Sequence, residues 1–98
     1  SEEKVNEWVF ELLVAWDENA EIGDAIGWYL HSKGLESLHE VVKRLYEERP
    51  LQPLLRASDL MDKVPAQKIG KILKAVRRKQ LFSPEFNLKE ALDFVKNN

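Results

Sequence analysis

The sequence contains no cysteine, which excludes disulfide bonds and thiolate metal sites. It has no apolar run near the roughly 20 residues that a membrane-spanning helix needs. No secretory signal pattern stands at its start. From these absences we expect a protein without a membrane segment, located in the cytoplasm.

Patterns that carry chemistry are also scarce. His31 and His39 belong to no recognisable ligand motif, and we interpret them as surface or capping residues. The acidic residues between positions 17 and 24 lack EF-hand spacing, and a junction between two helices explains them. There is no phosphate-binding glycine loop and no nucleophile with a paired base. We therefore predict no catalytic residue, no metal site and no cofactor.

The residues that are present favour a helical protein. Hydrophobic residues make up 44% of the 98 positions and charged residues 33%, a mixture typical of globular rather than disordered chains. Apolar residues recur at helical spacing along the chain, and no segment shows convincing strand alternation. A chain of this length can build one compact core. The predicted fold is all-α, a single compact domain of about five helices over residues 1–98.

Charge is distributed unevenly along the chain, although the net charge is only −2. Residues 1–50 contain twelve acidic and five basic side chains, a net −7, whereas residues 51–98 contain five acidic and ten basic ones, a net +5. We therefore divide the domain into an acidic helical body, 1–50, and a basic tail-like region, 53–98. Nucleic-acid binding has to be judged from this distribution and not from the total.

The acidic body begins with a helix predicted over residues 1–17. Trp8 and Trp16 lie on its apolar stripe, and Phe10 widens the apolar surface beyond what one buried face needs. Such a helix is either central to a small core or covered by a partner. We favour packing over base stacking for Trp8 and Trp16, because phosphates avoid an acidic helix.

Glycines shape the second predicted helix, which runs from an Asn19 cap to about residue 33. Gly34 should stop this helix. Gly23 and Gly27 would each cost about 1 kcal/mol relative to alanine inside it. Their spacing of four residues therefore predicts close packing against a neighbouring helix.

Capping signals mark most of the remaining helices. The capping box at 37–40 should start a third helix that ends before Pro50. Ser58 is a candidate cap for a short helical turn, and the box at 87–90 should start the last helix. The loop before that last helix contains Phe82 and Phe86, for which we favour packing against the core over contact with nucleic acid.

The basic helix, expected over about 65–81, is the most distinctive feature. Residues 63–79 include seven basic side chains and no acidic one. Ile69, Ile72 and Val76 fall on one arc of this helix, opposite most of the lysines. Docking through that arc would leave a positive face suited to phosphates. The predicted backbone-binding residues are Lys63, Lys68, Gly70, Lys71, Lys74, Arg78 and Lys79, with Arg56 and Arg77 as possible flanking contacts.

Gly70 has two interpretations that local features do not separate. In the first turns of a lysine-rich helix, a glycine would allow RNA to approach the backbone closely, and Pro65 at the helix start would leave free N–H groups nearby. The alternative is that Gly70 makes room for a neighbouring helix.

Four short motifs follow one another in the basic region: Ala-Ser-Asp-Leu at 57–60, Pro-Ala-Gln-Lys-Ile-Gly at 65–70, Gln-Leu at 80–81 and Glu-Ala-Leu at 90–92. Their order and spacing resemble the C-terminal tail of bacterial class II tRNA nucleotidyltransferases, the CCA-adding and A-adding enzymes of the poly(A) polymerase-like family. Those tails show a small-residue-x-Asp-Leu element, Pro-Gly-Pro-x-x-Gly, a helix ending in Gln-Leu, and a last helix with Glu-Ala-Leu. This chain departs from the pattern at Ala57, where glycine is usual, and at 66–67, where Gly-Pro is usual.

The resemblance implies a non-catalytic domain in tRNA processing that grips tRNA by its shape and phosphate backbone. The family's catalytic head, with its Gly-Ser element and metal-binding carboxylates, has no counterpart here, so that chemistry would belong to another segment or chain. Such a head, or another protein, could contact the Trp8/Trp16 helix.

Two alternatives stay open. Residues 63–70 could begin a helix–hairpin–helix module that binds the backbone of duplex DNA, although the usual Gly-hydrophobic-Gly hairpin is missing. The chain could instead be a protein-interaction domain that docks through Trp8, Phe10 and Trp16, with the basic helix merely solvated.

Overall fold

A computed structural model describes the backbone of residues 2–97 and the side chains of residues 7–97. Within that range the chain forms six α-helices and no strand, which confirms the all-α fold. Five of the helices are longer than one turn, in agreement with the number expected. None of the described helices combines the length and the apolar character needed to cross a membrane. The helices are α1 (Glu2–Glu18), α2 (Ile22–Ser32), α3 (Glu36–Glu48), α4 (Ala57–Leu60), α5 (Ala66–Phe82) and α6 (Leu88–Lys96).

The chain divides into two compact units, residues 1–49 and 50–98. The first contains α1 to α3 and has a net charge of −7, with twelve acidic and five basic side chains. The second contains α4 to α6 and has a net charge of +5, with five acidic and ten basic side chains. We call them the acidic unit and the basic unit; their grouping into one domain stays a prediction.

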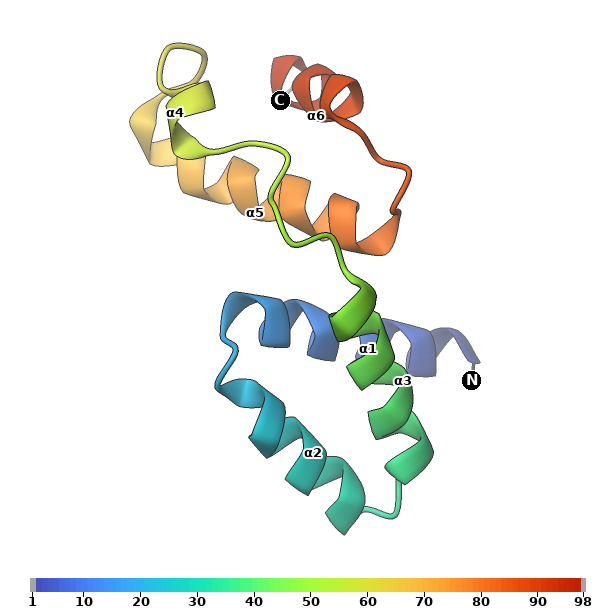
Figure 1. Ribbon diagram of the computed structural model, residues 1–98. Coiled ribbons are helices and arrows are strands. Elements are labelled where there is room, and N and C mark those ends of the chain that lie inside the picture. Colours follow the sequence, from blue (N-terminus) through green and yellow to red (C-terminus); the bar gives the residue numbers. More distant parts are fainter. Residues whose placement is uncertain (1, 98) are drawn as a thin grey trace. The chain divides into compact units, whose positions relative to one another are not determined.

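In the acidic unit each helix packs against the other two (Figure 1). Buried apolar side chains include Val9 from α1, Leu30 from α2 and Val42 from α3, the last two with no exposed surface. The two glycines of α2 confirm the predicted close packing. A Cβ atom added at Gly23 would lie 2.6 Å from the indole of Trp16, and one at Gly27 would lie 3.0 Å from Nε2 of His39.

The end of α2 follows the prediction for Gly34. This residue has a φ of 71°, in the left-handed region that favours glycine. Its N–H donates to the carbonyl of His31 at 3.1 Å, and the N–H of Leu35 donates to the carbonyl of Leu30 at 2.8 Å. These two bonds form a Schellman motif, which satisfies carbonyl groups that the end of a helix leaves open.

Helix starts agree with the sequence less uniformly. Asn19 is not the N-cap of α2 as predicted, because Glu21 occupies that position without a side-chain cap; the side chain of Asn19 accepts from the N–H of Glu21 at 3.0 Å in the turn before the helix. The predicted box at 37–40 is wrong: Leu35 occupies the N-cap position without a side-chain cap, and Ser37 already lies in the first turn of α3. The Gly34 turn brings the chain into α3 before Ser37 is reached.

Ser58 is also not a cap. It lies inside α4, and the carboxylate of Asp59 accepts from the N–H of Arg56 at 2.8 Å. The box at 87–90 is confirmed, because Oδ1 of Asn87 accepts from the N–H of Glu90 at 2.9 Å and Oε1 of Glu90 accepts from the N–H of Asn87 at 3.4 Å.

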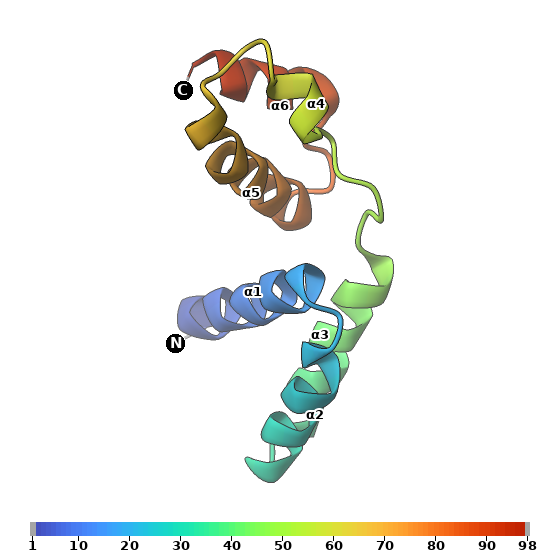
Figure 2. The same ribbon diagram turned by 90° about the vertical axis from the view of Figure 1, so that its left-hand side faces the viewer.

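The basic unit is built on α5, with α4 and α6 packed on the same side of it (Figures 1 and 2). Phe86 packs against the core of this unit, as expected, whereas Phe82 is 75% exposed. The core is formed by Leu55, Leu60, Ile72, Val76, Ala91 and Val95.

Candidate nucleic-acid interface

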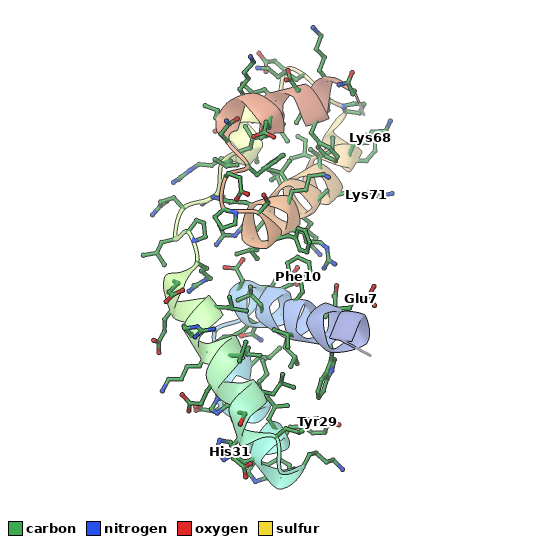
Figure 3. The ribbon with its side chains drawn as sticks, turned by 90° about the vertical axis from the view of Figure 1, so that its right-hand side faces the viewer. Glu7, Phe10, Tyr29, His31, Lys68 and Lys71 are labelled. Atoms are coloured by element: carbon green, nitrogen blue, oxygen red, sulfur yellow. The ribbon has the colours of Figure 1, made fainter. Side chains whose placement is uncertain are left out.

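The two sides of α5 separate as the helical period predicts. Ile72 and Val76 are 6% and 2% exposed, and the half-buried Ile69 packs beside them on the core. With its apolar arc covered, α5 presents a lysine face, which we define as the exposed residues Lys68, Lys71, Lys74 and Lys79. Figure 3 shows the side chains of Lys68 and Lys71 extending outward from the helix.

The amines of the lysine face are not neutralised within the part of the chain that the structure describes. Lys68, Lys71 and Lys74 form no ion pair there. The amine of Lys79 lies 5.1 Å from the ring centroid of Phe94, a cation–π contact that leaves its charge in place. A cluster of uncompensated positive charges raises the local concentration of a polyanion.

Lys63 stands just before α5 and is also exposed. Its amine lies 3.8 Å from Oδ1 of Asp62, but both side chains are largely in solvent, so this pair holds the amine only weakly. Lys63 therefore extends the positive surface past the start of the helix.

The structure gives the arginines different roles. Arg77 is half-buried; Nη2 donates to the carbonyl of Pro50 at 2.8 Å and Nη1 donates to Oε1 of Gln80 at 2.8 Å. Arg56 is exposed, and Nη2 donates to Oε1 of Gln52 at 2.9 Å. Both guanidinium groups thus hold the connector before α4. Arg78 is half-buried and makes contacts of its own within the chain.

Gly70 is exposed, and a Cβ atom added there would meet no described atom within 4 Å. The interpretation that this glycine accommodates a neighbouring helix is therefore wrong. Its backbone is open on the outer surface of α5, two residues after Lys68 and one before Lys71.

Beside the lysine face, a groove separates α5 from α6. A hollow of about 520 Å³ is lined by Lys63, Lys68 and Lys96, and one of about 270 Å³ by Lys68, Lys71 and Phe94. Lys68 borders both hollows, so they adjoin. Sequence reasoning missed Lys96: helical spacing places it next to Leu92, but only the packing of α6 on α5 brings it to the same hollow as Lys68.

Acidic side chains mark one limit of the positive surface. A further hollow, of about 430 Å³, is lined by Asp59 and Asp62 and also touches Lys63 and Leu92. The two carboxylates make this hollow less favourable for an anion than the groove or the lysine face.

The tryptophans of the acidic unit lie in different environments. The indole of Trp16 stacks on Tyr46, with ring centroids 4.0 Å apart and planes 8° apart. The guanidinium of Arg49 lies 3.7 Å from the centroid of the same Tyr46 ring, and its Nε donates to Asp17 at 2.8 Å. Trp16 is thus a packing residue. Trp28, the third tryptophan of the chain, is 75% exposed.

The two histidines lie at helix ends, but they also contact each other. Nε2 of His31 and Nδ1 of His39 are 3.0 Å apart and share a hydrogen bond, one from the last turn of α2 and one from the first turn of α3. Their separation of eight residues across the Gly34 turn could have indicated this contact. Among the described residues, no three side chains of the kinds that bind metals come together.

No family model, curated protein or solved structure matches this chain.

Proposed function

We propose that the basic unit binds the phosphate backbone of a folded RNA, with tRNA as the expected ligand, and that the chain carries no catalysis of its own. The observation that supports this most directly is the set of exposed amines at Lys68, Lys71 and Lys74, which form no ion pair with any described residue and lie on a helix whose other side is buried. Successive members of this set are three residues apart, which is about 4.5 Å along a helix axis. Flexible lysines at such intervals can follow a line of phosphates.

The choice of RNA rests on the resemblance of residues 54–95 to a tRNA-binding tail. Recognition by shape and backbone is the usual way in which proteins bind structured RNA. A helix–hairpin–helix site for duplex DNA is the less supported hypothesis, because the chain lacks the usual Gly-hydrophobic-Gly hairpin. Competition of unlabelled tRNA and duplex DNA against bound, labelled tRNA separates the two: tRNA should displace the label at the lower concentration.

The largest effect should come from reversing two charges on the lysine face. The double variant Lys71→Glu/Lys74→Glu should weaken tRNA binding by about 100-fold at low salt, because two phosphate contacts become repulsions. The slope of log affinity against log salt should also fall by about two. Fluorescence anisotropy of labelled tRNA, titrated at several salt concentrations, measures both quantities.

A matched control reverses two neighbouring charges in the acidic unit. Lys43 and Arg44 are exposed on α3, and Lys43→Glu/Arg44→Glu changes the net charge by the same amount. This control should bind tRNA nearly as the wild type does. Equal losses in the two double variants would mean that only net charge matters, and the lysine face would then not be the binding site.

Catalysis is tested separately. Incubation of the chain with ATP, magnesium and tRNA should leave the RNA length unchanged on a denaturing gel, because the described residues offer no cluster for binding metal. Appearance of an extended product would contradict the proposal.

Docking of a protein is a second candidate function, and the surroundings of Trp8 favour it. The Trp8 ring is 37% exposed and meets the edge of Tyr29, which is 45% exposed, at a centroid distance of 6.4 Å. Trp16 is enclosed by packing, so Trp8 is the better contact residue of the two. A separately produced nucleotidyltransferase head is the protein to test by pull-down: Trp8→Ala should weaken its capture, whereas Lys71→Glu/Lys74→Glu should not.

A further inference from the structure

We infer that the groove between α5 and α6 binds one unpaired nucleotide of the RNA, with the base on an apolar floor and the phosphate among the lysines of the rim. This inference rests on the proposed RNA binding and adds to it a subsite for a single nucleotide. The lysine face alone would contact only the phosphate backbone of the RNA and no base.

The larger hollow has the size and the lining that such a ligand needs. Its volume of about 520 Å³ lies within the range of roughly 300–1,000 Å³ that is typical of small-molecule sites. Apolar side chains from both sides of the groove line it: Val64, Pro65, Leu92 and Val95. Val95 is 5% exposed and belongs to the core, so this floor is held in place before any ligand arrives.

Lysine side chains from three parts of the basic unit surround this apolar floor. Lys63 precedes α5, Lys68 lies in its first turn and Lys96 ends α6, and all three line the hollow. Asp93 is the single carboxylate among the described residues of the lining, where three positive charges face it. An apolar floor with a cationic rim matches a nucleotide, which joins a flat base to a negatively charged phosphate.

The occupant has to be unpaired. A base inside a duplex is stacked and paired, so its face cannot reach the floor, whereas a base at an end or in a loop can leave the stack. Leu92 is 38% exposed, which leaves part of the floor uncovered for such a base.

The adjoining hollow provides a path for the rest of the strand. Lys68 borders both hollows, and the second also includes Lys71 and Phe94. A strand that leaves the nucleotide subsite can therefore continue past Lys68 onto the lysine face. The two contacts would hold neighbouring parts of one RNA.

Two RNA hairpins with the same stem test this subsite, one blunt and one with a single 3′ adenosine overhang. The full chain should bind the overhang hairpin about tenfold more tightly, as expected for one docked base. Leu92→Ser should remove this preference while leaving the affinity for the blunt hairpin unchanged. Leu88→Ser is the matched control, because Leu88 is a half-exposed leucine of α6 outside this hollow, and it should keep the preference.

A second pair of variants leaves the apolar floor intact, so it decides the question even if Leu92→Ser impairs folding. Lys96→Gln should weaken binding of the overhang hairpin more than binding of the blunt one, whereas Lys89→Gln, at an exposed position of α6 outside the hollow, should change neither. Circular dichroism verifies the helix content of every variant.

The outcomes separate the two proposals. Equal affinity of the wild type for both hairpins would overturn the nucleotide subsite and leave backbone binding standing. Absence of binding to either hairpin or to tRNA would refute RNA binding altogether. Free AMP should bind far more weakly than the overhang hairpin, because it lacks the contacts to the lysine face; AMP binding of equal strength would indicate a mononucleotide site and overturn the inference.

Discussion

Glycine occupies opposite kinds of position in the two units. In the acidic unit, a Cβ atom at Gly23 would lie 2.6 Å from the ring of Trp16, so the glycine is required by an aromatic side chain of the same unit. In the basic unit, Gly70 has no described atom within 4 Å of that position and lies exposed among lysines. Gly23 lowers the intrinsic stability of its helix, but it allows Trp16 to pack against that helix. Gly70 weakens its helix and makes no room for any described neighbour, so an exposed role for this glycine stays part of the proposed RNA binding.

Substitution of Gly23 tests the packing half of this contrast and should give the largest change in stability. Gly23→Ala should lower the free energy of unfolding by about 2 kcal/mol, because the Trp16 ring cannot move aside without losing its stack on Tyr46. All three tryptophans lie in residues 1–49, so their fluorescence during urea unfolding reports on the acidic unit. Unchanged or increased stability would show that Trp16 can move aside. Gly23 would then not be required for packing, and it would not differ from Gly70 in this respect.

The helix caps differ between the units as well, and they allow a smaller test. Asn87→Ala should lower the stability of the basic unit by about 1 kcal/mol, because the side chain of Asn87 accepts from the N–H of Glu90. Ser37→Ala is the control, since Ser37 caps nothing in the structure. Circular dichroism during urea unfolding should show a lower midpoint for the first variant only. An equal loss in the second would mean that Ser37 caps α3 in solution.

Local rules explain what the sequence predicted well. The all-α fold and the separation of Ile72 from Lys71 on α5 follow from the 3.6-residue period. Gly34 and Asn87 act through bonds to residues within five positions. Each of these features depends on residues that are close together in the sequence, and residue spacing can predict such local features.

The features that the sequence did not predict depend on contacts between segments. Arg77 and Lys74 are both basic residues of α5, but Arg77 bonds to the carbonyl of Pro50 because the connector passes beside it. Lys96 joins the groove only because α6 packs on α5. The spacing of Ser37 to Glu40 predicts a cap, but α3 starts earlier, directly after the Gly34 turn. The spacing of residues within one segment does not tell which distant segment will pack beside it.

Gly70 gives the smallest expected effect, but one that links stability to binding. Gly70→Ala should raise the free energy of unfolding of the basic unit by about 0.5 to 1 kcal/mol, because alanine favours a helix and its methyl group meets nothing described within 4 Å. If RNA lies against this backbone, the same methyl group should weaken tRNA binding a few-fold. Urea unfolding followed by circular dichroism and tRNA anisotropy measure the two effects on one variant.

Gly27→Ala is the companion variant, because its Cβ would lie 3.0 Å from Nε2 of His39 in the acidic unit. It should lower stability, because the hydrogen bond to His31 holds the His39 ring in place, and it should leave tRNA binding unchanged, so it differs from Gly70→Ala in both respects. A gain in stability at Gly70 without any loss of binding would mean that the RNA contacts the lysine side chains and stays away from the helix backbone. The open glycine would then no longer mark the binding surface, and the assignment would depend on the amines of Lys68, Lys71 and Lys74 alone.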